Sequence, residues 1–187
     1  MKQLRGIVMC GGQSSRMGTD KGLIPIYGTC WAAYMADRLA VIPVPVSVSI
    51  NSTQQQQYRA FFSDEELIID SLNIGGPING LLSVHAQYPH DDLLLLACDM
   101  ISMQSETLSR LINTYTTEAG CDFYVYQNVD FAEPLCAIYT SRGLKKLIQN
   151  QAPASLQNSS LQKVLNGGIT KRLTTAEPES FKNQNTM

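Results

Sequence analysis

The feature that most constrains the fold is a regular alternation of short apolar runs with longer amphipathic segments. The apolar runs predict strands over residues 4–9, 44–50, 67–69, 93–97, 123–126, 135–139 and 169–173. Helices are predicted over residues 29–40, 54–62, 79–88, 141–149 and 160–165, and another begins after Ser102, with Thr29 and Ser102 as N-caps. Strands that alternate with helices form a mostly parallel sheet with helices on both faces. The predicted fold class is α/β, a three-layer α/β/α arrangement, with the very apolar run 93–97 as its central strand.

Length and composition indicate an ordinary globular protein. The 187 residues suit one domain, 1–187, with one sizeable core. Only 16% of residues are charged, the net charge is -2, and no long basic run occurs, so nucleic acid is not an expected partner. The apolar stretch before Gly11 is too short for a signal peptide or a membrane span, so we expect a cytoplasmic protein without a membrane partner. The five cysteines form no CxxC pair, which suits a reducing compartment and argues against zinc.

A glycine-rich loop follows the first predicted strand, and residues 9–21 read MCGGQSSRMGTDK. Glycines let a ligand approach the backbone, and the N–H groups of such a turn can hold phosphate oxygens. Arg16 and Lys21 add two cations that can neutralise the charge of a triphosphate. The loop matches neither the GxxxxGK[ST] pattern nor the GxGxxG pattern. It therefore predicts a phosphate-binding loop of another kind, and the alternative is a plain strand-to-helix turn with two solvated cations.

Polar residues also follow three other predicted strands, namely Asn51, Asp70 and Asp99. Ligands of such sheets bind at the carboxyl ends of the strands, so we expect these side chains near the glycine-rich loop. Asp99 can hold Mg²⁺, which usually takes one or two protein carboxylates together with phosphate oxygens. Asn51 and Asp70 can hydrogen-bond a base or a ribose, although either residue also suits a simple turn.

The loop has the form LxGGxSxRMGxDK, with Met9 in place of the leucine. In this string the chain resembles the molybdenum cofactor guanylyltransferases, a family within the sugar-nucleotide-type nucleotidyltransferases. The likeness continues through residues 67–71, 76–80 and 98–99, and it resumes near residues 183–186. The resemblance implies a Rossmann-like nucleotidyltransferase fold with a mostly parallel central sheet.

The resemblance also implies roles for individual residues. Catalysis would depend on Arg16, Lys21 and Asp99, and Asp99 would bind the metal, Mg²⁺. The positions that match GTP-binding residues are Met9, Cys10, Gly11, Gly12, Lys21, Asn51, Asp70 and Asp99. Those that match the acceptor side are Gly80, Asn183 and Asn185. Whether Asn51 or Asp70 reads the guanine base stays open.

The implied reaction is transfer of GMP from GTP to the terminal phosphate of molybdenum-bound molybdopterin, with release of pyrophosphate. The acceptor is already an anion, so the reaction needs alignment and charge stabilisation rather than a strong base. Proteins that insert or deliver the cofactor are implied as further partners. Two alternatives stay open: a sister nucleotidyltransferase that uses CTP or a sugar phosphate, and a non-catalytic nucleotide-binding domain.

Overall fold

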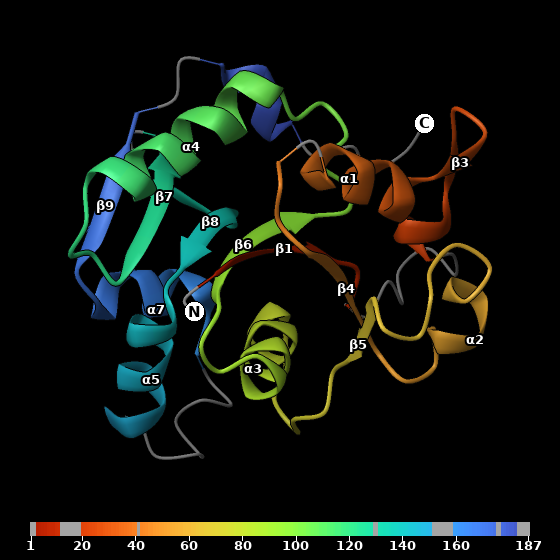
Figure 1. Cartoon of the computed structure of the whole chain (residues 1–187), viewed down its shortest axis with the longest axis horizontal. Helices are drawn as coiled ribbons and strands as arrows, with labels where there is room; N and C mark the ends of the chain where they lie inside the picture. The colour runs from red at the N-terminus through yellow and green to blue at the C-terminus, as the bar shows by residue number, and fades with distance from the viewer. Residues whose placement is uncertain are drawn as a thin grey trace.

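A seven-stranded sheet forms the centre of the molecule (Figure 1). The computed structural model describes residues 3–11, 20–40, 42–128, 131–150, 159–174 and 177–182. From edge to edge the strands are β5 (Leu67–Ile69), β4 (Val46–Ile50), β1 (Leu4–Met9), β6 (Asp92–Ala97), β8 (Ala132–Tyr139), β7 (Phe123–Gln127) and β9 (Thr170–Leu173). β8 runs antiparallel to both of its neighbours, and every other neighbouring pair in this sheet is parallel. The mostly parallel sheet and the central place of β6 are therefore confirmed.

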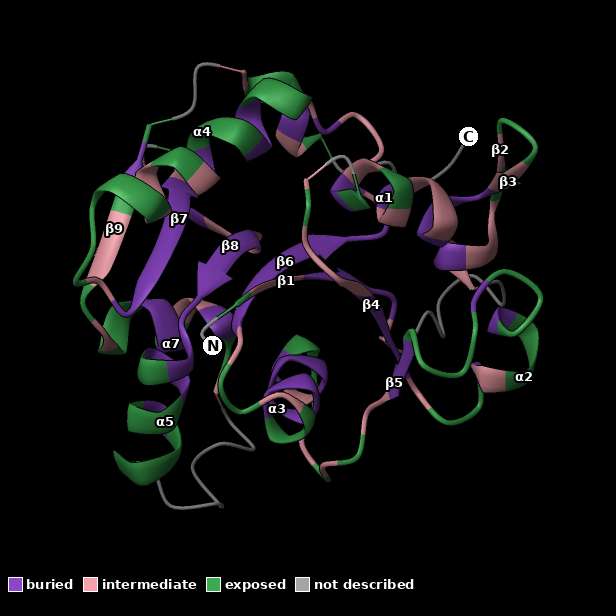
Figure 2. Cartoon of the chain, in the orientation of Figure 1, coloured by how far each residue is buried: buried purple, intermediate pink, exposed green. Residues whose placement is uncertain are grey.

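Helices cover both faces of this sheet. One face carries α1 (Trp31–Ala40) and α4 (Ser105–Thr117), and the other carries α3 (Pro77–Gln87), α5 (Ser141–Asn150) and α7 (Leu161–Gly167) (Figure 1). Successive strand residues point to opposite faces, so Val8 joins the apolar cluster of α1 and α4 while Ile7 joins that of α3, α5 and α7. Figure 2 shows the buried strands in the middle and exposed outer surfaces on the helices. The three-layer α/β/α prediction is confirmed.

Some element boundaries differ from the sequence prediction. Thr29–Cys30 is not the start of a helix but β3, which pairs with β2 (Pro25–Ile26) in a small hairpin, and α1 begins at Trp31. The tip of the hairpin is Tyr27 and Gly28, with φ of 47° and 82°. The spacing of apolar residues, from which the helix was predicted, carries no information about such a turn. The helix predicted over 54–62 lasts only from Gln55 to Tyr58, as α2. Similarly, α4 begins at Ser105, so Ser102 does not cap it.

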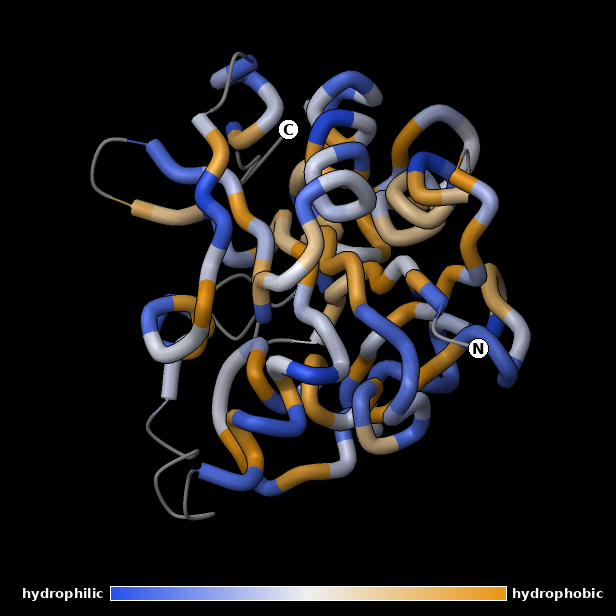
Figure 3. Tube along the Cα trace, turned by 60° about the vertical axis from the view of Figure 1, so that its left-hand side comes forward, coloured by the Kyte–Doolittle hydropathy of each residue, from blue (hydrophilic) through white to orange (hydrophobic). Residues whose placement is uncertain are grey.

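Hydrophobic residues are spread along the chain in short runs. In Figure 3 hydrophobic and hydrophilic stretches alternate over a few residues at a time. The longest of the described helices, α4, has 13 residues. Within the described ranges no helix is both long enough and apolar enough to cross a membrane.

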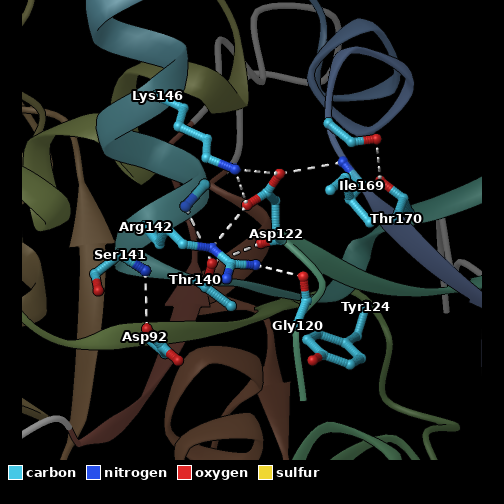
Figure 4. Close-up of polar contacts among 12 residues, drawn as sticks. Asp92, Gly120, Asp122, Tyr124, Thr140, Ser141, Arg142, Lys146, Ile169 and Thr170 are labelled. Carbon is cyan, nitrogen blue, oxygen red and sulfur yellow. Dashed lines mark hydrogen bonds and ion pairs between the residues drawn. The ribbon is translucent and has the colours of Figure 1, made fainter. Parts of the chain in front are cut away.

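A buried carboxylate connects α5 to the beginnings of the strands β7 and β9 (Figure 4). Asp122 directly precedes β7, and its side chain is only 4% exposed. It accepts hydrogen bonds at 3.0 Å from Arg142 and from Lys146, and one at 3.2 Å from the N–H of Ile169. Burial by itself would raise the pKa of Asp122, but these hydrogen bonds outweigh it and lower the pKa. The cluster therefore stabilises the end of the sheet at which β7 and β9 begin, which is opposite to the carboxyl ends of β1 and β6.

Candidate active site at the carboxyl ends of the strands

The carboxyl ends of four neighbouring parallel strands meet at one edge of the sheet. Gly11 lies just beyond β1, Asn51 beyond β4, Asp70 beyond β5 and Asp99 beyond β6. Backbone hydrogen bonds continue past the strands and hold these ends together. The N–H of Gly11 donates to the carbonyl of Ser49 at 3.0 Å, and the N–H of Asp70 donates to that of Ile50 at 2.8 Å. The structure thus gathers four residues that are far apart in sequence.

Lys21 and Asp99 form an ion pair, with 3.4 Å between the Lys21 Nζ and the Asp99 Oδ2. Lys21 begins the 3₁₀ turn η1 (Lys21–Leu23), whereas Asp99 follows the central strand β6. Their side chains are 29% and 16% exposed, so the pair is partly shielded and still accessible to a ligand. A cation beside a carboxylate can receive both a phosphate oxygen and a divalent metal ion.

The Asp70 carboxylate is packed closely against two glycines. A methyl group on Gly11 would lie 2.5 Å from the Asp70 Oδ2, and one on Gly80 would lie 3.1 Å from the Asp70 Oδ1. The fully buried Ser49 hydroxyl donates to the Asp70 Oδ1 at 2.8 Å. Burial raises the pKa of Asp70, and the hydrogen bond from Ser49 opposes part of that rise. Glycine at positions 11 and 80 therefore leaves room for this carboxylate.

The residues around the start of the loop contribute in a different way from the one that the sequence suggests. The N–H of Gly11 is already bound to the Ser49 carbonyl, so close approach rather than a phosphate-facing N–H is its contribution. Met9 and Cys10 are 5% and 8% exposed, and their side chains pack in the core on opposite faces of the sheet. Gly80, which the resemblance assigns to the acceptor, lies against Met9 and Asp70, two positions that the resemblance assigns to GTP.

Asn51 caps the turn that leads into α2. Its Oδ1 accepts hydrogen bonds from the Thr53 N–H at 3.0 Å, the Thr53 hydroxyl at 2.6 Å and the Gln54 N–H at 3.2 Å. Among the described residues none accepts a hydrogen bond from the Nδ2 of Asn51. A turn-forming role and a ligand-binding role are thus compatible, since they use different atoms of one side chain.

Gln54 and Tyr58, whose side chains contact Asp20, have no role in the sequence prediction. The Asp20 carboxylate accepts hydrogen bonds from the Gln54 Nε2 at 2.6 Å, from the Tyr58 hydroxyl at 3.0 Å and from the Gly22 N–H at 3.0 Å. Gln54 is 8% exposed and Tyr58 is fully buried. The one sequence signal for this pair is the spacing of four between Gln54 and Tyr58, because residues four apart lie on the same side of a helical turn.

Four of the predicted site residues, Gly12, Arg16, Asn183 and Asn185, lie outside the described residues. Over the described part of the chain, no three or more His, Cys, Asp or Glu side chains are grouped so that they could hold a metal ion. Among the described residues, Asp99 is the one carboxylate that the resemblance assigns to the metal.

Comparison with known proteins identifies the family. The pattern of the MobA-like NTP transferase domain matches residues 6–173. The molybdenum cofactor guanylyltransferase of Vibrio vulnificus is 31% identical over 147 residues, which are 75% of this chain and 70% of that protein. The molybdenum cofactor biosynthesis bifunctional protein of Synechocystis is 30% identical over 148 residues, but this match covers 79% of the chain and only 42% of the bifunctional protein.

A solved structure shows the same fold. Molybdopterin-guanine dinucleotide biosynthesis protein A from Archaeoglobus fulgidus has a TM-score of 0.76, with 97% of this chain and 92% of that chain covered, at 22% identity. The predicted Rossmann-like nucleotidyltransferase fold and the predicted class of enzyme, a nucleotidyltransferase, are confirmed. The chain belongs to the MobA-like NTP transferase domain family and, within it, to the molybdenum cofactor guanylyltransferases.

Proposed function

We propose that this chain transfers GMP from GTP to the terminal phosphate of molybdenum-bound molybdopterin and releases pyrophosphate. The observation that carries the proposal is the Lys21–Asp99 pair, 3.4 Å apart at the carboxyl ends of the strands. Transfer of a nucleotide from a triphosphate requires charge stabilisation at one place, and this pair offers a fixed cation beside a metal-binding carboxylate. The relative from Vibrio vulnificus, a molybdenum cofactor guanylyltransferase, supports GTP as the donor.

Mg²⁺ fits the residues present at this position. Asp99 is a partly exposed carboxylate that follows Cys98 just beyond the buried strand β6. Mg²⁺ commonly binds one or two carboxylates, with phosphate oxygens and waters as its other ligands. When bound, Mg²⁺ would supply positive charge that neutralises phosphate oxygens. Asp99 is the residue that would hold it.

The side chains of this protein would then align and neutralise the reactants. An acceptor phosphate oxygen forms a bond to the α-phosphorus of GTP, and the bond from that phosphorus to the departing pyrophosphate oxygen breaks. The Lys21 ammonium, together with Arg16, offsets the charge on the phosphates during this exchange. No proton has to leave the acceptor oxygen, because it is already an anion.

Base recognition would use the ends of β4 and β5. The ionised carboxylate of Asp70 can accept hydrogen bonds from the N–H groups of guanine, and Ser49 orients this carboxylate. The Asn51 Nδ2 is a donor that a ribose or base oxygen can use. On the acceptor side we propose Gly80, Asn183 and Asn185, with proteins that insert or deliver the cofactor as further partners.

The test is pyrophosphate release from GTP and Mg²⁺, measured with and without metal-loaded molybdopterin. We expect release that depends on the acceptor and that is much faster with GTP than with CTP. Asp99→Ala should lower kcat by about 100-fold or more, since it removes the carboxylate beside Lys21. The matched control is Asp64→Ala, because Asp64 is 64% exposed in a surface pair with Arg59. Equal rates with CTP would refute guanylyl transfer, and near-normal activity of Asp99→Ala would refute the metal assignment.

A further inference from the structure

One buried side chain connects the two ends of the glycine-rich loop. The Gln54 Nε2 donates to the Cys10 carbonyl at 3.2 Å, just before the loop, and to the Asp20 Oδ2 at 2.6 Å, just after it. The Gln54 Oε1 accepts a hydrogen bond from the Asn51 N–H at 2.8 Å. Gln54 is 8% exposed, so both hydrogens of its amide and its carbonyl are used inside the protein.

We propose that Gln54 is a positioning residue that clamps the ends of the nucleotide-binding loop and thereby holds Lys21 beside Asp99. This inference rests on the proposed function, because it assigns Lys21 to the phosphates of the nucleotide. Lys21 follows Asp20 directly in the chain, so fixing the Asp20 carboxylate also fixes the backbone from which the Lys21 side chain extends.

The clamp has a second part at the other oxygen of the Asp20 carboxylate. The Asp20 Oδ1 accepts from the Tyr58 hydroxyl and from the Gly22 N–H, each at 3.0 Å. Gly22 is buried, and a methyl group at this position would overlap the Tyr58 hydroxyl. Both oxygens of the Asp20 carboxylate are therefore bound by α2 or its N-cap, and residues 20–22 cannot shift relative to α2 without breaking these hydrogen bonds.

The neutral amide is suited to this place because it must donate to a carboxylate and a carbonyl at once. A glutamate at position 54 would put a second carboxylate beside Asp20 and would have no hydrogens for the Cys10 carbonyl. We therefore expect Gln54→Glu to be more damaging than Gln54→Ala. This order is the reverse of what side-chain volume alone predicts.

The experiment compares steady-state kinetics of the full chain and its Gln54→Ala variant with GTP, Mg²⁺ and metal-loaded molybdopterin. A displacement of the order of 1 Å at Lys21 should reduce kcat by about tenfold or more. The KM for GTP should change by less than about threefold, because most of the nucleotide contacts are retained. Gln56→Ala is the matched control, since Gln56 is an exposed glutamine of the same helix α2, and it should leave both constants unchanged.

A double-mutant cycle with Lys21→Ala separates positioning from general destabilisation. If Gln54 acts through Lys21, then Gln54→Ala should cost less than about twofold once Lys21 is already alanine. Equal losses in both backgrounds would overturn the proposal, and so would an unchanged kcat. If Gln54→Ala does not fold, Tyr58→Phe takes its place, because it removes one hydrogen bond to Asp20 and keeps the buried ring.

Hydrogen exchange tests the clamp without catalysis. Gln54→Ala should speed exchange of the Gly22 amide by about tenfold or more while the amides of β6 stay protected. If the wild-type chain releases no pyrophosphate, the proposed function fails. The exchange rate of the Gly22 amide then still tests whether Gln54 fixes residues 20–22. Unchanged exchange at Gly22 would overturn the clamp, whatever the enzyme does.

Discussion

Replacing Gly11 by alanine adds one methyl group at the end of β1, directly against the Asp70 carboxylate. The new carbon would lie 2.5 Å from the Asp70 Oδ2, whereas ordinary contact begins at 3.4 Å, so the oxygen must retreat by about 0.9 Å. Gly11 is not among the described glycines of positive φ, which are Gly28, Gly76 and Gly120. Alanine can therefore adopt the backbone conformation, and the contact with Asp70 is the source of the strain.

The expected magnitude follows from what this displacement breaks. Overpacking at a buried position usually costs about 1–3 kcal/mol in the free energy of unfolding. Here the Asp70 side chain can turn away, at the expense of its 2.8 Å hydrogen bond with Ser49, so we expect a cost near the low end of that range. A lost hydrogen bond between a charged carboxylate and GTP is worth about 1.5–3 kcal/mol, which corresponds to a loss of GTP affinity of roughly 10- to 150-fold.

Calorimetric titration measures the GTP affinity of the variant, and thermal unfolding measures its loss of stability. The control is Gly167→Ala, because a methyl group at Gly167 would meet no atom within 4 Å. Adding Asp70→Ala to Gly11→Ala should restore part of the lost stability, since it removes the atoms that the methyl group displaces. Unchanged GTP affinity and unchanged melting of Gly11→Ala, or strictly additive losses in the double variant, would refute this reasoning.

Three further outcomes follow from buried polar groups. Asp122→Asn should lower the free energy of unfolding by about 1–3 kcal/mol in urea titrations at pH 7, and this loss should shrink below about pH 4, where the unfolded chain protonates its aspartates. Burial lowers the pKa of His85 below its usual 6.5, and the charges of Lys145 and His90 lower it further, so stability should fall as the pH drops below that value. His85→Leu should flatten this fall in urea titrations, and an unchanged pH dependence would contradict the role of His85. Ser49→Ala removes the hydrogen bond that opposes the raised pKa of Asp70, so GTP binding should weaken at a higher pH than in the wild type when affinity is titrated between pH 7 and 5; an identical acid limb would contradict the role of Asp70.

Much of the fold could be predicted because the apolar pattern follows the two faces of the sheet. Residues 93–97 are apolar at every position, and β6 is buried on both faces in the middle of the sheet, as such a run predicts. The apolar pattern fails where local backbone geometry determines the secondary structure. The turn at Tyr27 and Gly28 pairs Thr29–Cys30 with β2, so these two residues form β3 instead of the predicted start of the helix. The apolar pattern also cannot give strand order, because the pairing of β1 with β6 depends on contacts across about ninety residues.

The sequence alone therefore determined the fold class, and it predicted a phosphate-binding loop and the candidate residues at the strand ends. Only the tertiary structure decided how these residues meet, because it sets the register in which the parallel strands end. It placed Lys21 beside Asp99, it bound the Gly11 N–H to the Ser49 carbonyl, and it packed Asp70 against the two glycines. It also revealed Gln54, whose contacts lie 34 and 44 residues away in the chain, too far for any local pattern to encode.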